Sequence, residues 1–95
     1  SIMSAYVVVH LTILDGEKIA AYSAVAGPSV TNHGGEFVCK GPAEMLHGDA
    51  IGKNIVIVKF DSKAAAKAWY NSEEYQAIIP IRNEGAESCF ILGGE

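Results

Sequence analysis

The sequence predicts a single α+β domain in which two strand–helix–strand units share one sheet. Runs rich in β-branched and other apolar residues occur near both ends of the chain and in its middle. Stretches with helical signals, residues 17–33 and 63–80, separate these runs. The chain has 95 residues and is 49% hydrophobic, which suits one domain with a real core.

The first predicted strand covers residues 5–13, and its alternation divides it into two different faces. The aliphatic face consists of Val7, Val9, Leu11 and Ile13. The mixed face consists of Tyr6, Val8, His10 and Thr12. We expect helices to cover the aliphatic face, and we expect the mixed face to line a pocket or to meet another subunit.

A helix is predicted from Glu17 onward, after a short turn. The side chains available for its inward stripe are Ile19, Ala20, Tyr22, Ser23 and Ala26. A Gly-Pro pair at residues 27–28 interrupts the pattern, so the proline either kinks the helix or begins a second segment over residues 30–33. Two glycines at residues 34–35 end the helical region, because glycine readily takes the positive φ common after a helix.

A short strand over residues 37–40 is predicted next, and a turn or bulge at residues 41–42 follows it. An extended segment or a hairpin arm over residues 43–47 comes after the turn, and then a loop over 48–52. The most hydrophobic run of the chain, residues 54–60, predicts the central strand of the sheet, because central strands are the most buried.

The second helical region begins with Ser62, a good N-cap for the alanine-rich helix predicted over residues 63–70. Ser72 caps a further helix, Pro80 breaks or bends it, and residues 87–92 form the last strand. The order βαββαβ predicts a ferredoxin-like, four-stranded antiparallel sheet with helices on one face. A second copy of the chain is the economical cover for the other face, so we expect a homodimer whose two sheets enclose a barrel-like interior.

Charge and hydropathy argue against several classes of function. A formal charge of −4 argues against nucleic acid as a partner, because phosphate binding demands a basic surface. No apolar run approaches the roughly 20 residues that a membrane span needs. The basic and apolar regions of a secretory signal are missing, so we expect a cytoplasmic protein. We expect one domain over residues 1–95, with residues 1–4 disordered or left over from expression.

Cys39 and Cys89 each lie in an apolar, strand-like run, without a partner at metal-ligand spacing. We interpret them as small buried side chains that stay reduced in the cytosol. A redox pair would require that their two strands be neighbours in the sheet.

Several motifs together resemble one family. The longest is Trp69-Tyr70-x-Ser72-x-Glu74-Tyr75-Gln76. It comes after Phe60-x-Ser62 and Ala65 or Ala66, and it is followed by Arg82. Further matching positions are Tyr6-Val7-Val8, Tyr22, Gly34-Gly35-x-Phe37, Gly41 before Glu44, and Ser88-x-Phe90-x-Leu92-Gly93. Over nearly its whole length, the chain is therefore similar to the family catalogued as domain of unknown function 1330.

The resemblance implies a ferredoxin-like dimeric α/β-barrel, in a superfamily that includes small cofactor-free monooxygenases, muconolactone isomerases and haem-handling relatives. The family has no agreed reaction, so the resemblance transfers the fold much better than the function. Two positions depart from the family pattern. His47 stands before the loop glycine and Lys59 stands late in the central strand, where relatives commonly carry acids. Roles of those carboxylates in relatives are therefore not carried over to this chain.

His10 is the predicted catalytic residue, because histidine titrates near neutral pH and the mixed face should line the space between two sheets. The alternative is a histidine that is hydrogen-bonded inside a dimer interface. Arg82 is predicted to hold a carboxylate with its planar fork. The alternative for Arg82 is a structural ion pair with Glu74, Glu84 or Glu87.

Lys40, Tyr70 and Trp69 complete the predicted ligand-binding residues. Lys40 would add positive charge to a pocket, unless it is a solvated strand end. Trp69 and Tyr70 point about 100° apart on a helix, so one should pack on the sheet while the other reaches the rim of the pocket. Core packing is the main alternative for Trp69, because aromatic side chains bury large areas.

No complete motif for a known reaction is present. The sequence has no phosphate-binding glycine loop, no nucleophile elbow and no metal-ligand spacing among its histidines, so we expect no cofactor and no metal. One hypothesis is binding, with or without turnover, of a small carboxylate or enolate by a cofactor-free protein. Arg82 and Lys40 would then supply charge, and His10 would shuttle a proton. The other hypothesis is a non-enzymatic ligand carrier, sensor or stress-associated assembly protein.

Overall fold

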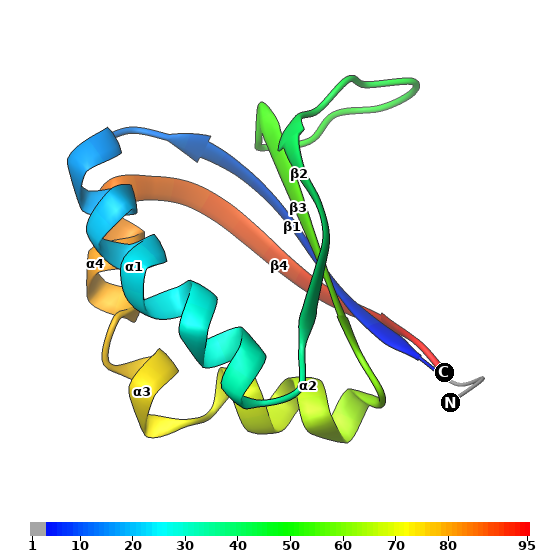
Figure 1. The fold of residues 1–95 in the computed structure, drawn as a ribbon. Helices are drawn as coiled ribbons and strands as arrows, with labels where there is room; N and C mark the ends of the chain where they lie inside the picture. The colour runs from blue at the N-terminus through cyan, green and yellow to red at the C-terminus, as the bar shows by residue number, and fades with distance from the viewer. Residues whose placement is uncertain (1–3) are drawn as a thin grey trace.

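The computed structural model describes residues 4–95, and Figure 1 shows one sheet with the helices on one side of it. The elements follow in the order β1 (Ala5–Ile13), α1 (Gly16–Asn32), β2 (Glu36–Pro42), β3 (Asn54–Phe60), α2 (Lys63–Tyr70), α3 (Glu73–Gln76), α4 (Ile79–Gly85) and β4 (Ala86–Gly94). The strand order is β2-β3-β1-β4, with antiparallel neighbours throughout. The predicted α+β, ferredoxin-like class is confirmed, and β3 lies inside the sheet as expected.

The two ends of the described chain lie together, as Figure 1 also shows. The Glu95 backbone N–H donates to the Ser4 carbonyl at 3.0 Å. The prediction that residues 1–4 are disordered or left over from expression stays a prediction, and residues 1–3 lie outside the described part of the chain. Among residues 4–95, no helix is both long and apolar enough to cross a membrane.

α1 is one continuous helix, so the separate second segment that was one of the two predicted alternatives at Pro28 does not form. The Asp15 side chain caps the helix by accepting hydrogen bonds from the backbone N–H groups of Glu17 (3.1 Å) and Lys18 (3.2 Å). Pro28 is exposed, so its ring lies on the solvent side of the helix. A proline removes a single N–H donor, and packing of the inward face outweighs that loss here.

β2 contains a bulge that decides which of its side chains face the helices. The register shifts after Phe37, where Val38 is the additional residue. Phe37 pairs with Val58 and Lys40 pairs with Val56, so both lie on the helix-covered side of the sheet. Residues three apart in a regular strand point to opposite faces, and the bulge is what brings Phe37 and Lys40 to the same face.

Residues 43–53 form a loop, so the extended segment predicted over residues 43–47 is wrong. A hydrogen bond from the Ala43 N–H to the Lys53 carbonyl (2.9 Å) closes the base of this loop. Residues 44–51 are all exposed, and none of them takes part in the pairing of the four strands. Figure 1 shows the loop projecting away from the sheet beyond β2 and β3.

The core lies between the sheet and the helices. Val7 and Val9 of β1 are buried there with Val58 and Phe60 of β3, which confirms the predicted aliphatic face. Tyr6, on the other face, is 36% exposed. We call this other side the open sheet face. Its residues across the four strands are Tyr6, Val8, His10, Thr12, Glu36, Cys39, Gly41, Ile55, Ile57, Lys59, Glu87, Cys89, Ile91 and Gly93.

The two cysteines do not form a pair. β2 and β4 are the edge strands, so Cys39 and Cys89 lie near opposite edges of the sheet. Both are free, and the strand adjacency that a redox pair requires is not met. Cys39 is exposed and Cys89 is partly buried, so the prediction of a buried side chain is wrong for Cys39 in the single chain.

Candidate functional site

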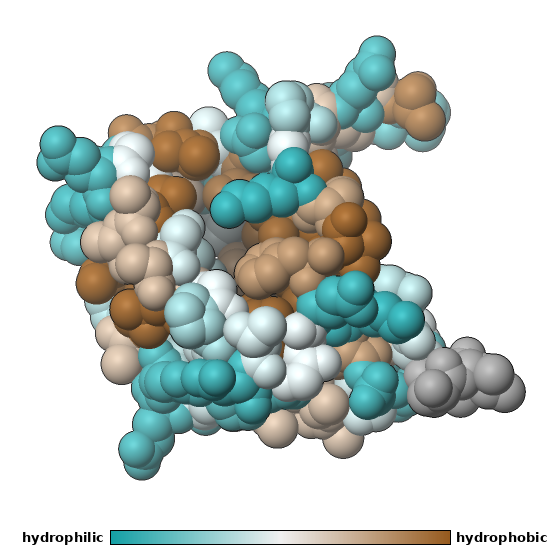
Figure 2. All heavy atoms as spheres, in the orientation of Figure 1, coloured by the Kyte–Doolittle hydropathy of each residue, from teal (hydrophilic) through white to brown (hydrophobic). Residues whose placement is uncertain are grey.

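A cavity of about 480 Å³ lies between the sheet and α1. Figure 2 shows the molecule hollowed on this side, with hydrophobic side chains around the hollow. Most of the lining is aliphatic or aromatic and comes from β1, β3, α1 and the ends of β2 and β4. The polar and charged side chains in the lining are Tyr22, Ser23, Lys40, Asn54, Arg82 and Ser88. An apolar chamber with a few polar groups is typical of sites for small organic molecules.

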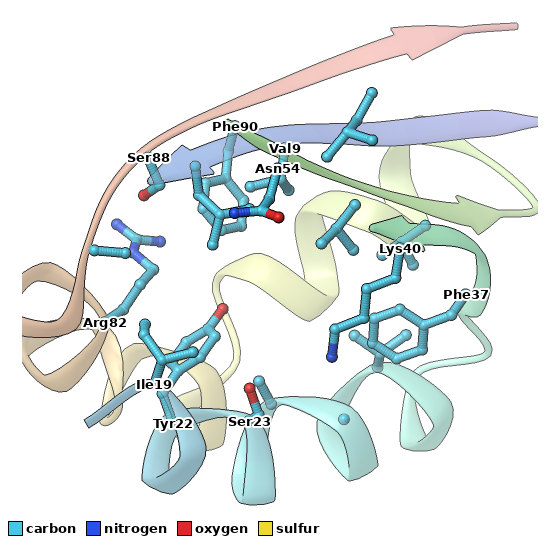
Figure 3. Close-up of a pocket in the computed structure, with 18 of the residues that line it drawn as sticks. Val9, Ile19, Tyr22, Ser23, Phe37, Lys40, Asn54, Arg82, Ser88 and Phe90 are labelled. Carbon is cyan, nitrogen blue, oxygen red and sulfur yellow. The ribbon is translucent and has the colours of Figure 1, made fainter. Parts of the chain in front are cut away.

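α1 supplies one wall through residues spaced at helical intervals. Ile19, Tyr22, Ser23 and Ala26 of the predicted inward stripe line the cavity, whereas Ala20 is exposed. The bulge in β2 supplies the opposite rim, because it turns both Phe37 and Lys40 toward the cavity. In Figure 3, Lys40 and Phe37 lie toward one end of the cavity, and Arg82 and the Tyr22 hydroxyl lie toward the other.

Arg82 is held in place by aromatic and polar neighbours. Its Nη1 donates to the hydroxyl oxygens of Tyr70 and Tyr75, each at 3.1 Å. Its Nε donates to Asn83 Oδ1 at 3.2 Å. The guanidinium carbon lies 4.6 Å from the centre of the Phe90 ring, within the range of cation–π attraction. The guanidinium is therefore oriented before any ligand binds.

No carboxylate neutralises Arg82 among the described residues. Two of its three predicted partners lie beside other basic side chains, since Lys18 Nζ lies 3.4 Å from Glu84 Oε2 and His33 Nδ1 lies 3.3 Å from Glu74 Oε1. Burial alone would lower the pKa of Arg82, but its hydrogen bonds to Tyr70 and Tyr75 outweigh burial and raise that pKa. Arg82 is thus a permanent cation at the edge of an apolar cavity.

Tyr22 and Tyr75 extend the polar group around Arg82. Their hydroxyl oxygens lie 2.7 Å apart, so one hydroxyl donates to the other. Burial raises the pKa of Tyr22 far above its ordinary value, and the neighbouring Tyr75 adds to this effect. Burial also raises the pKa of Tyr75, although its hydrogen bonds to Tyr22 and Arg82 act in the opposite direction. Both hydroxyls are therefore neutral at physiological pH.

The predicted ligand-binding residues are close to this cavity. Arg82, Lys40 and Trp69 line it, and Tyr70 contacts Arg82 from the far side. Tyr70 and Trp69 also line a neighbouring pocket of about 330 Å³ between α2 and β4. Trp69 is only 2% exposed and its Nε1 donates to Ser29 Oγ at 3.0 Å, so most of this side chain is part of the core.

His10 is not brought together with Arg82 and Lys40. It lies on the open sheet face, between Ile55 of β3 and Cys89 of β4. Its Nδ1 is buried and has no hydrogen-bond partner within residues 4–95. Its predicted proton shuttle to a ligand at Arg82 would have to act across the sheet, so a catalytic role for His10 stays a prediction that this geometry does not support.

The two positions that depart from the family pattern lie outside the cavity lining. His47 is exposed in the loop over residues 43–53, and Lys59 lies on the open sheet face opposite Tyr6. Neither residue contributes to the charge of the cavity. Among residues 4–95, no three His, Cys, Asp or Glu side chains come together in a group that could hold a metal ion.

Several lining residues were absent from the predicted site. Tyr22 and Ser23 were placed on the inward face of α1, but periodicity alone does not separate a cavity wall from a core contact. Asn54 and Ser88 lie near strand ends, where the sequence shows only a polar residue beside an apolar run. Phe37 joins the lining because of the bulge, and a bulge without glycine at its extra residue leaves little trace in the sequence.

Known proteins resemble this chain in fold. No curated protein matches it. A crystal structure of a protein of unknown function from Rhodopseudomonas palustris has a TM-score of 0.78 and 21% identity, covering 98% of this chain and 82% of that one. SnoaB, a cofactor-independent oxygenase from Streptomyces nogalater, has a TM-score of 0.70 and 12% identity, covering 96% and 91%. A dimeric ferredoxin-like protein of unknown function from Thermobifida fusca has a TM-score of 0.63 and 9% identity, covering 98% and 92%.

These low identities show a shared fold and do not transfer an activity. A family model gives a more specific result, because it matches residues 4–94 and so covers nearly the whole chain. The match agrees with the motif around Trp69 and Tyr70 that resembled the same family. The chain belongs to the family described as Domain of unknown function (DUF1330).

Proposed function

We propose that this protein binds a small organic anion with an apolar body in the cavity between the sheet and α1. The observation that carries the proposal is Arg82, a cation that lines an apolar cavity without a carboxylate partner among the described residues. An unpaired charge in such a place is costly unless a counter-ion arrives. A carboxylate or enolate oxygen on the ligand would serve as that counter-ion.

The apolar lining would hold the body of the ligand. Val9, Val56 and Val58 of the sheet and Ile19 and Ala26 of α1 form facing walls. Each Å² of apolar ligand and cavity surface that is removed from water contributes about 25 cal/mol of favourable free energy to binding. Because tyrosines and Phe90 already hold Arg82, little side-chain entropy is lost when a ligand binds.

Lys40 has a different role in this proposal. It is exposed at the β2 side of the cavity, so its ammonium is hydrated when the cavity is empty. A mobile cation at the mouth attracts anions and raises their rate of entry, but it fixes their position less than the guanidinium of Arg82 does. We therefore assign recognition to Arg82 and electrostatic attraction to Lys40.

Binding is the part of the earlier hypotheses that the geometry favours. The cavity lining contains no carboxylate and no imidazole among the described residues, so the usual general bases are not placed beside the ligand. SnoaB shows that a protein of this fold can be a cofactor-independent oxygenase, but 12% identity does not transfer its reaction. The proposal therefore covers binding of the ligand, and catalytic turnover of the ligand needs a separate measurement.

We also propose that the protein is a homodimer whose subunits meet through the open sheet face. Tyr6 and Ile91 on this face are 36% and 51% exposed, and Val8 lies next to both and pairs with Ile57 of β3 on its other side. A second copy would cover these side chains, and one of its polar groups would satisfy His10 Nδ1. The Thermobifida fusca structure is described as dimeric, which supports a dimer without indicating which faces meet. A cytoplasmic location stays a prediction, which cell fractionation would test.

A binding screen tests the proposed function. Small aromatic and aliphatic carboxylates, enols and phenols are added to the wild-type protein, and binding is measured by thermal shift and then by calorimetry. Arg82→Ala should weaken the best ligand about tenfold or more, because a hydrogen bond to a charged group is lost. Lys53→Ala is the matched control, since Lys53 is exposed and lies outside the cavity lining.

Two results would count against the proposal. One is a wild-type protein that binds no compound of these classes. The other is equal affinity in Arg82→Ala and Lys53→Ala, which would place the ligand elsewhere. Circular dichroism of each variant shows whether the fold is retained, and product analysis of the incubated mixtures reports any turnover.

A further inference from the structure

We infer that the cavity recognises a single oxyanion, the deprotonated oxygen of an enol or a phenol, in preference to a carboxylate. This inference rests on the proposed function and narrows its ligand class. It follows from the donors that remain free at Arg82, and from the direction of the hydrogen bond between Tyr75 and Tyr22.

Arg82 has no complete pair of N–H groups left for a carboxylate. A carboxylate binds arginine most strongly through two parallel N–H groups, either from both Nη atoms or from Nε and one Nη. Both N–H groups of Nη1 are used by Tyr70 and Tyr75, and the N–H of Nε is used by Asn83. The guanidinium has two edges that could hold a carboxylate, one formed by Nη1 and Nη2 and the other by Nε and Nη2. Each edge therefore includes an atom that already donates to a protein oxygen, and only Nη2 is left without a partner among the described residues.

Tyr22 supplies a second donor. The Tyr75 oxygen accepts a hydrogen bond from Arg82, and one proton is shared between Tyr75 and Tyr22. Either hydroxyl could be the donor in this bond, and we assign Tyr75 as the donor because it is 0% exposed and has no other acceptor among the described residues, so the assignment avoids a buried unpaired donor. The proton of Tyr22 is then free, and Figure 3 shows this hydroxyl pointing into the cavity.

The chain of donors runs from Arg82 through Tyr75 to Tyr22. Donation from a cation polarises the Tyr75 hydroxyl, which strengthens the bond that it makes to Tyr22 and the donor strength of Tyr22 in turn. Burial raises the pKa of Tyr22, so this hydroxyl keeps its proton beside an anion. The cavity thus presents one strong O–H donor and the Nη2 donors of Arg82 at the same end.

This set of donors fits one charged oxygen. An enolate or phenolate oxygen accepts from Tyr22 and from Arg82 Nη2, and its ring or conjugated chain lies against aromatic walls that include Phe90 and Phe37. A carboxylate loses the paired contact that normally favours it at an arginine.

Two dyes with the same ring and substituent provide the test. 4-Nitrophenol at a pH where it is ionised and 4-nitrobenzoate differ in the anionic group only. Calorimetry of the wild-type protein should show tighter binding of 4-nitrophenolate by about tenfold, the value of one added hydrogen bond to a charged group. Equal or tighter binding of 4-nitrobenzoate overturns the inference while leaving the proposed function intact. Binding of neither dye contradicts both.

Two variants and one control test the hydroxyl donor of Tyr22 and the N–H donors of Arg82 separately. Tyr22→Phe removes only the hydroxyl, so it should weaken 4-nitrophenolate about tenfold and leave 4-nitrobenzoate nearly unchanged. Asn83→Ala frees Nε of Arg82 and should strengthen 4-nitrobenzoate, because one edge of the guanidinium regains two free donors. Tyr6→Phe, on the open sheet face, should change neither affinity.

The absorbance of the bound dye gives a readout that loss of packing would not produce. The wild-type protein should lower the pKa of bound 4-nitrophenol below that of the free dye, because two donors stabilise the anion. Tyr22→Phe should return that pKa toward the free value. An unchanged pKa of the dye in the wild-type complex would show that these donors do not contact its oxygen.

Discussion

The contact between Ser29 and Trp69 offers a quantitative test of how the floor of the cavity is held. Ser29 is 0% exposed on α1, and its Oγ accepts from Trp69 Nε1 at 3.0 Å while donating to the Ala26 carbonyl at 2.7 Å. Replacement by alanine leaves the indole N–H buried without an acceptor. The ring itself lies 4.4 Å from Tyr75, centre to centre, so movement of Trp69 would disturb the neighbours of Arg82.

The expected cost of Ser29→Ala follows from two opposing terms. An unsatisfied buried donor costs about 1–3 kcal/mol. Alanine gains up to about 0.7 kcal/mol of helix propensity over serine. The net loss in free energy of unfolding should be about 1–2 kcal/mol, which corresponds to a fall in Tm of roughly 4–8 °C per kcal/mol for a domain of this size.

Urea denaturation at a fixed protein concentration measures this loss. Trp69 is the single tryptophan, so its fluorescence reports the same contact that the variant changes. Thr31→Ala is the matched control, because Thr31 is an exposed residue of α1 whose hydroxyl also bonds to helix carbonyls. Stability of Ser29→Ala equal to the wild type, or an equal loss in Thr31→Ala, would refute the role given to this contact.

Three further predictions concern packing, pH and assembly. Gly35→Ala should lower the free energy of unfolding by about 1–3 kcal/mol in urea denaturation, because its Cβ would lie 2.6 Å from Val30 Cγ1 and 2.7 Å from Phe60 Cε1; an unchanged value would contradict this packing. Burial raises the folded-state pKa of Tyr22 above the unfolded value of 10.0, so the free energy of unfolding should fall as pH rises above about 10. The fall should be less steep in Tyr22→Phe, and parallel plots of unfolding free energy against pH for the two proteins would contradict the raised pKa. Light scattering of the wild-type protein should give the mass of the proposed dimer and that of Ile91→Asp the mass of a monomer, since a charge on the open sheet face opposes burial there; an unchanged mass would exclude this face.

The arrangement of the elements was accessible from the sequence because each element carries its own local signal. The alternation in β1 identified its buried face, and Ser62 marked the start of α2. Three features were missed for physical reasons. Pro28 stays within α1 because its ring faces solvent, residues 43–47 lack a pairing partner, and Cys39 lies on a face that no helix covers.

The candidate site was harder to derive, because a cavity depends on contacts between distant elements. Arg82 was named from its charge and planar fork and Lys40 from its charge, and the structure places both at one cavity. The partners that orient Arg82, Tyr70 and Tyr75, lie 12 and 7 residues before it, and no sequence spacing predicts that their hydroxyls meet one guanidinium. The structure places His10 on the mixed face of β1, as alternation predicted, but Arg82 and Lys40 line a cavity on the other side of the sheet.

A crystal structure of the complex with 4-nitrophenolate tests the central claim most directly. We expect the dye between the sheet and α1, with its oxygen within hydrogen-bonding distance of the Tyr22 hydroxyl and Arg82 Nη2. Its ring should lie against the apolar walls of the cavity. Density for the dye on the open sheet face beside His10, with an empty cavity, would contradict the claim and return the candidate site to His10.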